Sequence, residues 1–200
     1  MSILLVSSLS GKNAACVIMA SGASKRFGSN KLMADFDGMP LIKRILDITE
    51  GCFTRRVVVT RHEEVRAYCA GRNVDCILHD LPYRSDTVRL GLTRVLESDR
   101  CMFCQSDQPL LSRETILSLL ESAENDPVGI WRPRTHGEPG SPVLFPASLY
   151  PEIISLPEGK GGSYVIKAHP ELERYLEISD ARELMDVDTQ EDLERLLCLK

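Results

Sequence analysis

The sequence predicts a three-layer α/β fold in which helices cover both faces of a mostly parallel, mixed sheet. Short apolar runs alternate with runs of helical period along most of the chain, which is typical of successive β-α-β units. The 200 residues suit a single core, and 43% hydrophobic with 26% charged residues argue against disorder or a coiled coil. We expect one domain over residues 14–200, preceded by an N-terminal extension, residues 1–13, that can be disordered.

The first predicted unit is a buried strand, a loop and a helix. Residues 15–19, Ala-Cys-Val-Ile-Met, form an uninterrupted apolar run, and a loop rich in Gly and Ser follows them. Pro40 suits the first turn of a helix. The apolar face of that helix carries Leu41, Ile42, Ile45, Leu46 and Ile48.

Later elements follow from the same signals. We expect strands over residues 57–59, 74–78, 101–104, 128–131 and 142–145, with a polar loop over 133–140. Helices are expected over residues 63–70, over 85–96 with Ser85 or Asp86 as its cap, and after the cap Ser112. The last helix, residues 193–197, follows the cap Thr189, and Asp192 lies three residues after that cap.

Ligands of open α/β sheets bind beyond the carboxyl ends of the strands, so we expect functional residues after Met19, Leu78, Gln105 and Val187. The loop over residues 20–31 combines small residues with the cations Lys25, Arg26 and Lys31. This composition suits an anion site, and it suits a solvated Gly/Ser turn equally well. Neither a Walker A loop nor a G-x-G-x-x-G fingerprint is present there.

This loop, M-A-S-G-A-S-K-R-F-G-S-N-K, resembles the signature L-A-A-G-x-S-x-R-M-G-x-x-K of nucleotidyltransferases that bind a nucleoside triphosphate on a Rossmann-like sheet. The resemblance implies that Arg26 and Lys31 hold the triphosphate. It also implies that the backbone of Ala20, Ser21, Gly22, Ala23 and Ser24 borders the nucleotide.

Two acidic segments extend the resemblance. Asp107-Gln108-Pro109-Leu110-Leu111 is similar to the D-Q-P-L-L segment of molybdenum cofactor cytidylyltransferases, in which the Asp is a magnesium ligand. A carboxylate at a strand end suits such a hard cation, although an Asp two residues before Pro can also simply form a turn. Residues 186–193 are similar to the family's D-I-D-T-P-E-D-L, which implies Asp188 as the second Mg²⁺ ligand, with Asp186 as the alternative.

Three further segments carry the resemblance from residue 14 to residue 197. Residues 137–145 resemble the family's G-x-x-G-H-P-V-L-F segment, with Ser141 in place of His, and residues 158–162 resemble its G-D-K-G-A segment. We expect residues 137–142 and 160–162 of these segments to lie beside the second substrate. Residues 84–92 are similar to the R-x-D-S-V-x-x-G-L of methylerythritol phosphate cytidylyltransferases, which implies that Thr87 borders the cytosine. His79, at a strand end near that base pocket, is a further candidate for nucleotide binding.

The resemblance implies an enzyme that transfers CMP from CTP to the molybdenum cofactor, molybdopterin, with Mg²⁺ as cofactor and pyrophosphate as second product. A molybdenum hydroxylase apoenzyme is the implied protein partner. Alternatives are a guanylyltransferase, a methylerythritol phosphate cytidylyltransferase, or a non-catalytic carrier of the cofactor. Leu32 stands where guanylyltransferases commonly have Gly after the Lys, which favours CTP, and pyrophosphate release would distinguish an enzyme from a carrier.

Composition argues against other classes. The formal charge of −5 provides no basic field for nucleic acid, and no apolar run approaches the roughly 20 residues of a membrane span. Seven scattered cysteines suit reduced packing residues, so we expect a cytoplasmic protein. Cys101 and Cys104 have the spacing of a metal pair, but in a strand they would point to opposite faces.

Overall fold

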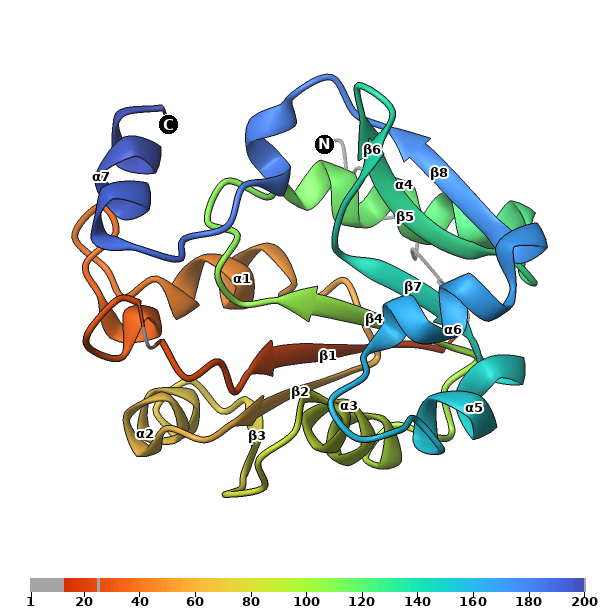
Figure 1. Ribbon diagram of the computed structural model, residues 1–200, viewed down its shortest axis with the longest axis horizontal. Coiled ribbons are helices and arrows are strands. Elements are labelled where there is room, and N and C mark those ends of the chain that lie inside the picture. Colours follow the sequence, from red (N-terminus) through yellow and green to blue (C-terminus); the bar gives the residue numbers. More distant parts are fainter. Residues whose placement is uncertain (1–12, 25, 200) are drawn as a thin grey trace, which may run out of the picture.

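The computed structural model, which describes residues 13–24 and 26–199, contains an eight-stranded mixed sheet with the order β3-β2-β1-β4-β7-β5-β6, and β8 pairs with β5 (Figure 1). Most of the expected N-terminal extension lies outside the described residues. The strands are β1 (Ala14–Ala20), β2 (Arg55–Thr60), β3 (Asp75–Leu78), β4 (Arg100–Gln105), β5 (Ile130–Thr135), β6 (Glu138–Pro139), β7 (Val143–Pro146) and β8 (Glu173–Glu177). The α-helices are α1 (Ile42–Ile48), α2 (Glu63–Ala70), α3 (Arg84–Thr93), α4 (Arg113–Asn125), α5 (Tyr150–Ile154), α6 (Gly162–Ala168) and α7 (Gln190–Cys198).

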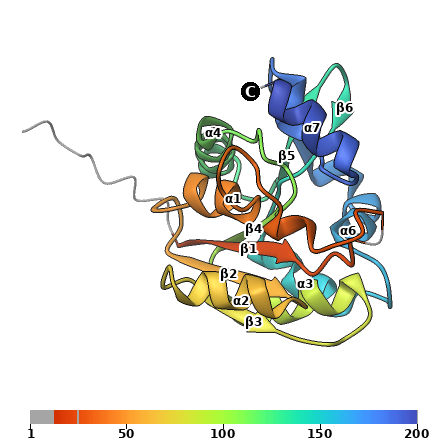
Figure 2. The same ribbon diagram turned by 90° about the vertical axis from the view of Figure 1, so that its left-hand side faces the viewer.

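The predicted three-layer fold is confirmed, because β1 contributes to two cores on opposite faces of the sheet. Its even-numbered residues pack with α1, α2, α4 and α7, whereas its odd-numbered residues pack with α3, α5 and α6. Figure 2 shows α1 and α4 on one side of the sheet and α3 on the other. A strand covered on both faces needs apolar residues throughout, which explains the uninterrupted run.

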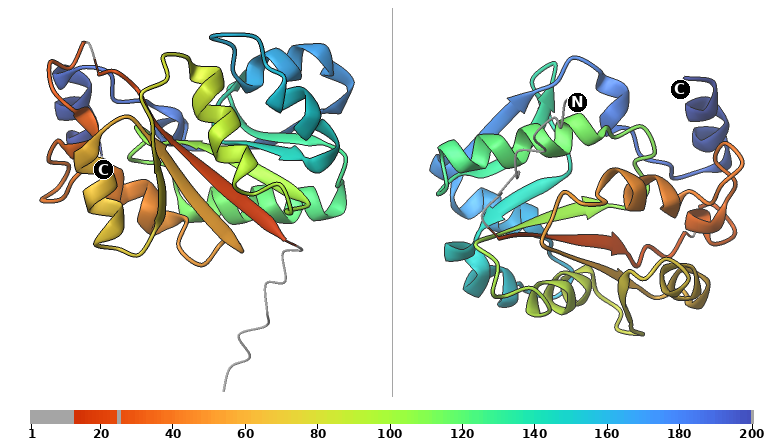
Figure 3. Two further views of the ribbon diagram at one scale, coloured as in Figure 1. Left: turned by 90° about the horizontal axis from the view of Figure 1, so that it is seen from below. Right: turned by 180° about the vertical axis from the view of Figure 1, so that it is seen from behind.

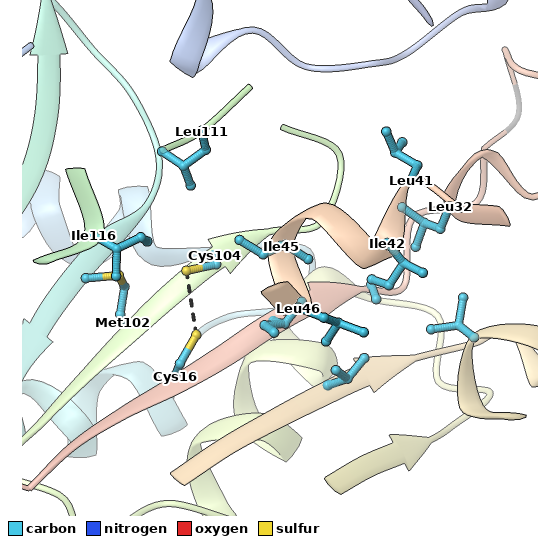
Figure 4. Packing of buried hydrophobic residues seen from close by; sticks show 14 of the residues in the cluster. Cys16, Leu32, Leu41, Ile42, Ile45, Leu46, Met102, Cys104, Leu111 and Ile116 are labelled. Carbon is cyan, nitrogen blue, oxygen red and sulfur yellow. Dashed lines mark hydrogen bonds between the residues drawn. The ribbon is translucent and has the colours of Figure 1, made fainter. Parts of the chain in front are cut away.

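The cysteines of β4 follow the alternation of the strand. Cys104 lies in the core beneath α1, where its sulfur is 3.6 Å from that of Cys16 (Figure 4), whereas Cys101 lies in the opposite core. The expectation that the two β4 cysteines face opposite sides is therefore confirmed.

Helix α3 lies across β1 and β2 (Figure 3) at unusually close range. A Cβ atom on Gly91 would be only 2.3 Å from Cγ1 of Val17 and 3.1 Å from Cγ2 of Val59. Glycine at this position therefore allows α3 to pack directly on the sheet. This packing fixes the first turn of α3 near the carboxyl ends of the strands.

Several predicted helix ends are confirmed. Ser112 caps α4 by accepting a hydrogen bond from the N–H of Thr115 at 3.0 Å, and Thr189 forms a capping box with Asp192 at the start of α7. The predicted cap of α3 is wrong. This helix begins at Arg84, so Ser85 and Asp86 lie inside its first turn. The carboxylate of Asp86 instead accepts from the N–H of Tyr83 at 3.0 Å.

The predicted polar loop over residues 133–140 is also wrong, and β8 was not expected. β5 continues to Thr135 and pairs with β6, while β8 runs parallel to β5. These strands are joined by polar contacts: Arg132 pairs with Glu173 at 3.2 Å, and the guanidinium of Arg134 lies 4.2 Å from the centre of the Tyr175 ring. Cross-strand pairs of this kind stabilise a sheet without producing an alternating hydrophobic pattern.

Strands β1 and β4 are parallel, and their carboxyl ends point toward the segment that leads into α7 (Figure 1). Val187 ends no strand, contrary to expectation, but its N–H donates to the carbonyl of Asp107 at 2.9 Å. The C-terminal segment therefore closes over the end of β4. Within the described ranges, no helix is both long and apolar enough to cross a membrane.

Candidate active site

A cavity of about 530 Å³, hereafter the first cavity, lies at the carboxyl ends of β1, β2 and β4. It is bounded by the loop after β1, the start of α3, the end of β4 and the segment before α7. Its lining residues are Met19, Ser21, Gly22, Ala23, Ser24, Arg26, Lys31, Arg61, Pro82, Tyr83, Arg84, Thr87, Gln105, Asp107, Asp186 and Asp188. The structure thus brings together nine of the eleven predicted site residues; Ala20 and His79 do not line this cavity.

The loop after β1 is held by its own backbone and by one buried side chain. The carbonyl of Ser24 accepts from the N–H groups of Phe27 and Gly28 at 3.0 and 3.2 Å. Phe27 is buried in the core, and Gly28 has the positive φ of +80° that favours glycine. These contacts place Arg26 at the rim of the cavity. Its exposed guanidinium lies 2.8 Å from Asp188.

Lys31 joins the two predicted metal ligands. Its ammonium donates to Asp107 at 2.7 Å, to Asp188 at 3.2 Å and to the carbonyl of Val187 at 2.6 Å. Burial lowers the pKa of Lys31. The negative charges of Asp107 and Asp188, together with the hydrogen bonds that Lys31 donates to them, outweigh burial and raise this pKa above its ordinary value. Lys31 is therefore a fixed cation at the bottom of the cavity.

The acidic residues around Lys31 fit a magnesium ion. Asp107 and Asp188 share one cation, and the second oxygen of Asp107 is buried without a partner among the described residues. Mg²⁺ is commonly held by one or two carboxylates together with substrate phosphates. Considering residues 13–24 and 26–199, no three His, Cys, Asp or Glu side chains converge into a metal cluster of protein ligands alone. A Mg²⁺ ion held by these carboxylates would complete its coordination with oxygen atoms of a ligand or of water.

Asp186 lies beside this pair, but the ammonium of Lys31 donates its hydrogen bonds to Asp107, Asp188 and the carbonyl of Val187 and not to Asp186. Partial burial of its carboxyl and the charge of Asp107 raise the pKa of Asp186 to about 6, against a hydrogen bond from Gln108 that lowers it. The geometry therefore favours Asp188 over Asp186 as the partner of Asp107.

His79 lies behind the wall of the first cavity. Its Nε2 is 2.9 Å from Oγ of Ser21 and 3.3 Å from Oγ1 of Thr87, and both of those residues line the cavity. Burial, followed by the charge of Arg61, lowers the pKa of His79. A neutral imidazole thus connects the loop after β1 to the first turn of α3. Ala20 is also behind the wall, where its carbonyl accepts from Thr60 at 2.9 Å.

Sequence reasoning missed several lining residues. Arg61 follows β2 directly, so the rule that ligands bind at strand ends could have identified it. Tyr83 and Arg84 lie at the start of α3, a helix end that the sequence placed slightly too late.

A second cavity of about 400 Å³ adjoins the first and shares Met19, Arg84 and Gln105 with it. Its other lining residues are Val88, Phe103, Arg132, Ser141, Val143, Phe145, Ile153, Gly159, Lys160, Gly161, Gly162, Ser163 and Ile166. Of the residues expected beside the second substrate, Ser141 and residues 160–162 line this cavity, whereas residues 137–140 and Pro142 do not. Two adjoining cavities, one carrying an acidic pair and cations, suit the joining of two substrates.

Comparison with known proteins agrees with this arrangement. Residues 16–174 match the MobA-like NTP transferase domain. A probable molybdenum cofactor guanylyltransferase from Aquifex aeolicus is 27% identical over 92% of this chain and 90% of its own length. The molybdenum cofactor cytidylyltransferase of Escherichia coli is 26% identical over 88% of this chain and 92% of its own. The crystal structure of Rv0371c from Mycobacterium tuberculosis superposes with a TM-score of 0.83 at 23% identity, covering 92% of this chain and 98% of that one.

Proposed function

Since this chain belongs to the family of MobA-like NTP transferase domains, we propose that it transfers CMP from CTP to the molybdenum cofactor and releases pyrophosphate. Nucleotidyl transfer in molybdenum cofactor synthesis is common to its guanylyl and cytidylyl relatives. The single observation that carries the proposal is the Lys31–Asp107–Asp188 cluster at the strand ends, next to a second cavity.

The choice of CTP rests on two local features. Leu32 follows Lys31, and it occupies the position where guanylyltransferases commonly have glycine. Thr87 lines the first cavity next to Ser21 and His79, so hydroxyl and imidazole groups border the place proposed for the base. Polar groups that pair with cytosine would be left unpaired by uracil, and such a pocket is small for guanine.

The reaction is an in-line displacement at the α-phosphorus. An oxygen of the acceptor's phosphate forms the new bond to phosphorus, and pyrophosphate leaves with the electrons of the broken bond. When bound by Asp107 and Asp188, Mg²⁺ would neutralise charge on the phosphate oxygens. Lys31 holds these two carboxylates together, and Arg26 and Arg61 place positive charge where the triphosphate would lie. Catalysis here consists of charge neutralisation and alignment, without a protein nucleophile.

Pyrophosphate release tests the proposal. With Mg²⁺, CTP and molybdenum cofactor, the protein should release one pyrophosphate for each cofactor consumed, and it should release none when the cofactor is omitted. A protein that bound the cofactor but released no pyrophosphate with any nucleoside triphosphate would be a carrier. That outcome would overturn the proposed enzyme activity.

A further inference from the structure

Of the residues that the structure describes, Met19, Arg84 and Gln105 line both cavities, and Arg84 is the one cation among them. It is the first residue of α3, and its side chain is exposed. In the part of the chain that the structure describes, its guanidinium forms no ion pair or hydrogen bond with a carboxylate. By contrast, Arg26 at the rim is paired with Asp188, and Arg132 in the second cavity is paired with Glu173. The donors of Arg84 thus remain available at the boundary between the cavities.

The loop over residues 158–162 is shaped to accommodate this side chain. The N–H of Gly159 donates to Oγ of Ser85 at 3.3 Å, which attaches the loop to the first turn of α3. A Cβ atom on Gly161 would lie 3.1 Å from Nε of Arg84 and 3.3 Å from its Cδ. Gly161 therefore leaves room for Arg84 between the helix and the loop, although its own φ of −131° requires no glycine.

The second cavity has the character of a site for an anion with an apolar part. Among the described residues, no carboxylate lines it, whereas Arg84, Arg132 and Lys160 do. Phe103 and Phe145 form its apolar wall, with their rings edge to face and 5.9 Å apart. This combination suits a phosphate monoester whose organic part packs against the aromatic rings.

We propose that Arg84 is a catalytic residue that contacts both reacting anions, the α-phosphate in the first cavity and the acceptor's phosphate in the second. This role rests on the proposed function. The planar guanidinium has five donors, so it can bind an oxygen of each phosphate at once and offset their mutual repulsion. As the acceptor oxygen bonds to the α-phosphorus and pyrophosphate departs, the two phosphates become one diphosphate, on which Arg84 remains bound.

Substitution of Arg84 tests the role by kinetics. Arg84→Met should lower kcat by about 10²-fold, and Arg84→Lys should recover only part of this loss because an ammonium lacks the planar fork. Gly161→Ala should also lower kcat, since the added methyl group displaces the guanidinium without removing its charge. The control is Arg94→Met, at the residue that directly follows α3, where Arg94 pairs with Asp75 at 2.9 Å and lines neither cavity. Its kcat should stay within about twofold of wild type.

A binding measurement separates this role from the proposed function. CDP-glycerol carries a diphosphate that would span both cavities, whereas CMP would occupy only the first. Titration calorimetry should show that Arg84→Met weakens CDP-glycerol binding by about tenfold or more. It should weaken CMP binding by a smaller factor, because CMP offers Arg84 only one of the two phosphates. If the wild type released no pyrophosphate, the proposed function and the catalytic role of Arg84 would both fail, and the binding measurement would show only whether Arg84 binds a diphosphate across the two cavities. Equal affinities of the wild type and Arg84→Met for CDP-glycerol, or no binding of CDP-glycerol by the wild type, would overturn the proposed role of Arg84.

Discussion

The ammonium of Lys31 lies 2.7 Å from the carboxylate of Asp107, and only 8% of the Lys31 side chain is exposed. The two residues are separated by 76 positions in the sequence, and the same ammonium reaches Asp188, a further 81 positions along. One cation therefore ties the loop after β1, the end of β4 and the segment before α7 into a single site. Its removal should affect both folding and function.

Lys31→Met should reduce the free energy of unfolding by about 1–3 kcal/mol, because it leaves two carboxylates without their shared cation. For a chain of this length, the melting temperature should fall by roughly 2–10 °C. Arg26→Met is the matched control, since the Arg26 side chain is 71% exposed and its ion pair with Asp188 contributes little. Thermal unfolding of both variants at pH 7 checks this. Equal melting temperatures would show that the buried ion pair does not stabilise the fold.

Asp107→Asn should lower the rate of pyrophosphate release by about 10²-fold or more while the protein remains folded, because an amide cannot neutralise a bound cation. Asp188→Asn should behave in the same way. The assay is run at saturating Mg²⁺, with circular dichroism to verify the fold. Near-normal turnover by Asp107→Asn would remove this residue from the catalytic site, and a larger effect from Asp186→Asn than from Asp188→Asn would make Asp186 the second ligand.

His79 should make the protein sensitive to acid. Its pKa is lowered in the fold, so the folded state holds the imidazole neutral while the unfolded chain takes up a proton near pH 6.5. The contribution of His79 to stability is therefore complete above pH 6.5 and is lost as the pH falls through the folded pKa. Denaturant unfolding at pH 7.5 and at pH 5 should show a larger loss for the wild type than for His79→Gln. Identical losses in the two proteins would contradict this assignment.

Nucleotide preference should appear in thermal stability. A ligand present at about 100 times its dissociation constant stabilises the folded state by roughly 2.7 kcal/mol, which for this length corresponds to roughly 5–10 °C. CTP with Mg²⁺ should produce this shift, and GTP and UTP clearly smaller ones. Thr87→Val, which preserves volume in a buried position, should reduce the CTP shift. A shift with GTP equal to that with CTP would contradict the cytosine pocket.

The parts of the fold that local patterns determine could be predicted from the sequence. The bounds of α2 and the caps Ser112 and Thr189 depend on neighbouring residues, and the uninterrupted apolar run of β1 indicates burial on both faces. β8 could not be predicted, because it is held beside β5 by polar partners about 40 positions away, such as Glu173 for Arg132.

The candidate site divides in the same way. Resemblance identified Lys31, Asp107 and Asp188, and the structure brings all three together. The expectation that Lys31 holds the triphosphate stays a prediction. The hydrogen bonds of its ammonium to the two carboxylates are contacts that no local pattern records. Arg84 was part of a matched segment, but its place between two cavities depends on how Gly161 packs against α3.

A competition experiment tests the central claim most directly. The protein is incubated with Mg²⁺, molybdenum cofactor and equal concentrations of CTP and GTP, and the products are separated and identified by mass spectrometry. Asp107→Asn is the inactive control. The account predicts pyrophosphate together with a cofactor that carries CMP, in at least about tenfold excess over one that carries GMP. A product dominated by GMP would contradict the cytidylyl assignment, and the absence of any nucleotide-bearing product would contradict the nucleotidyltransferase activity itself.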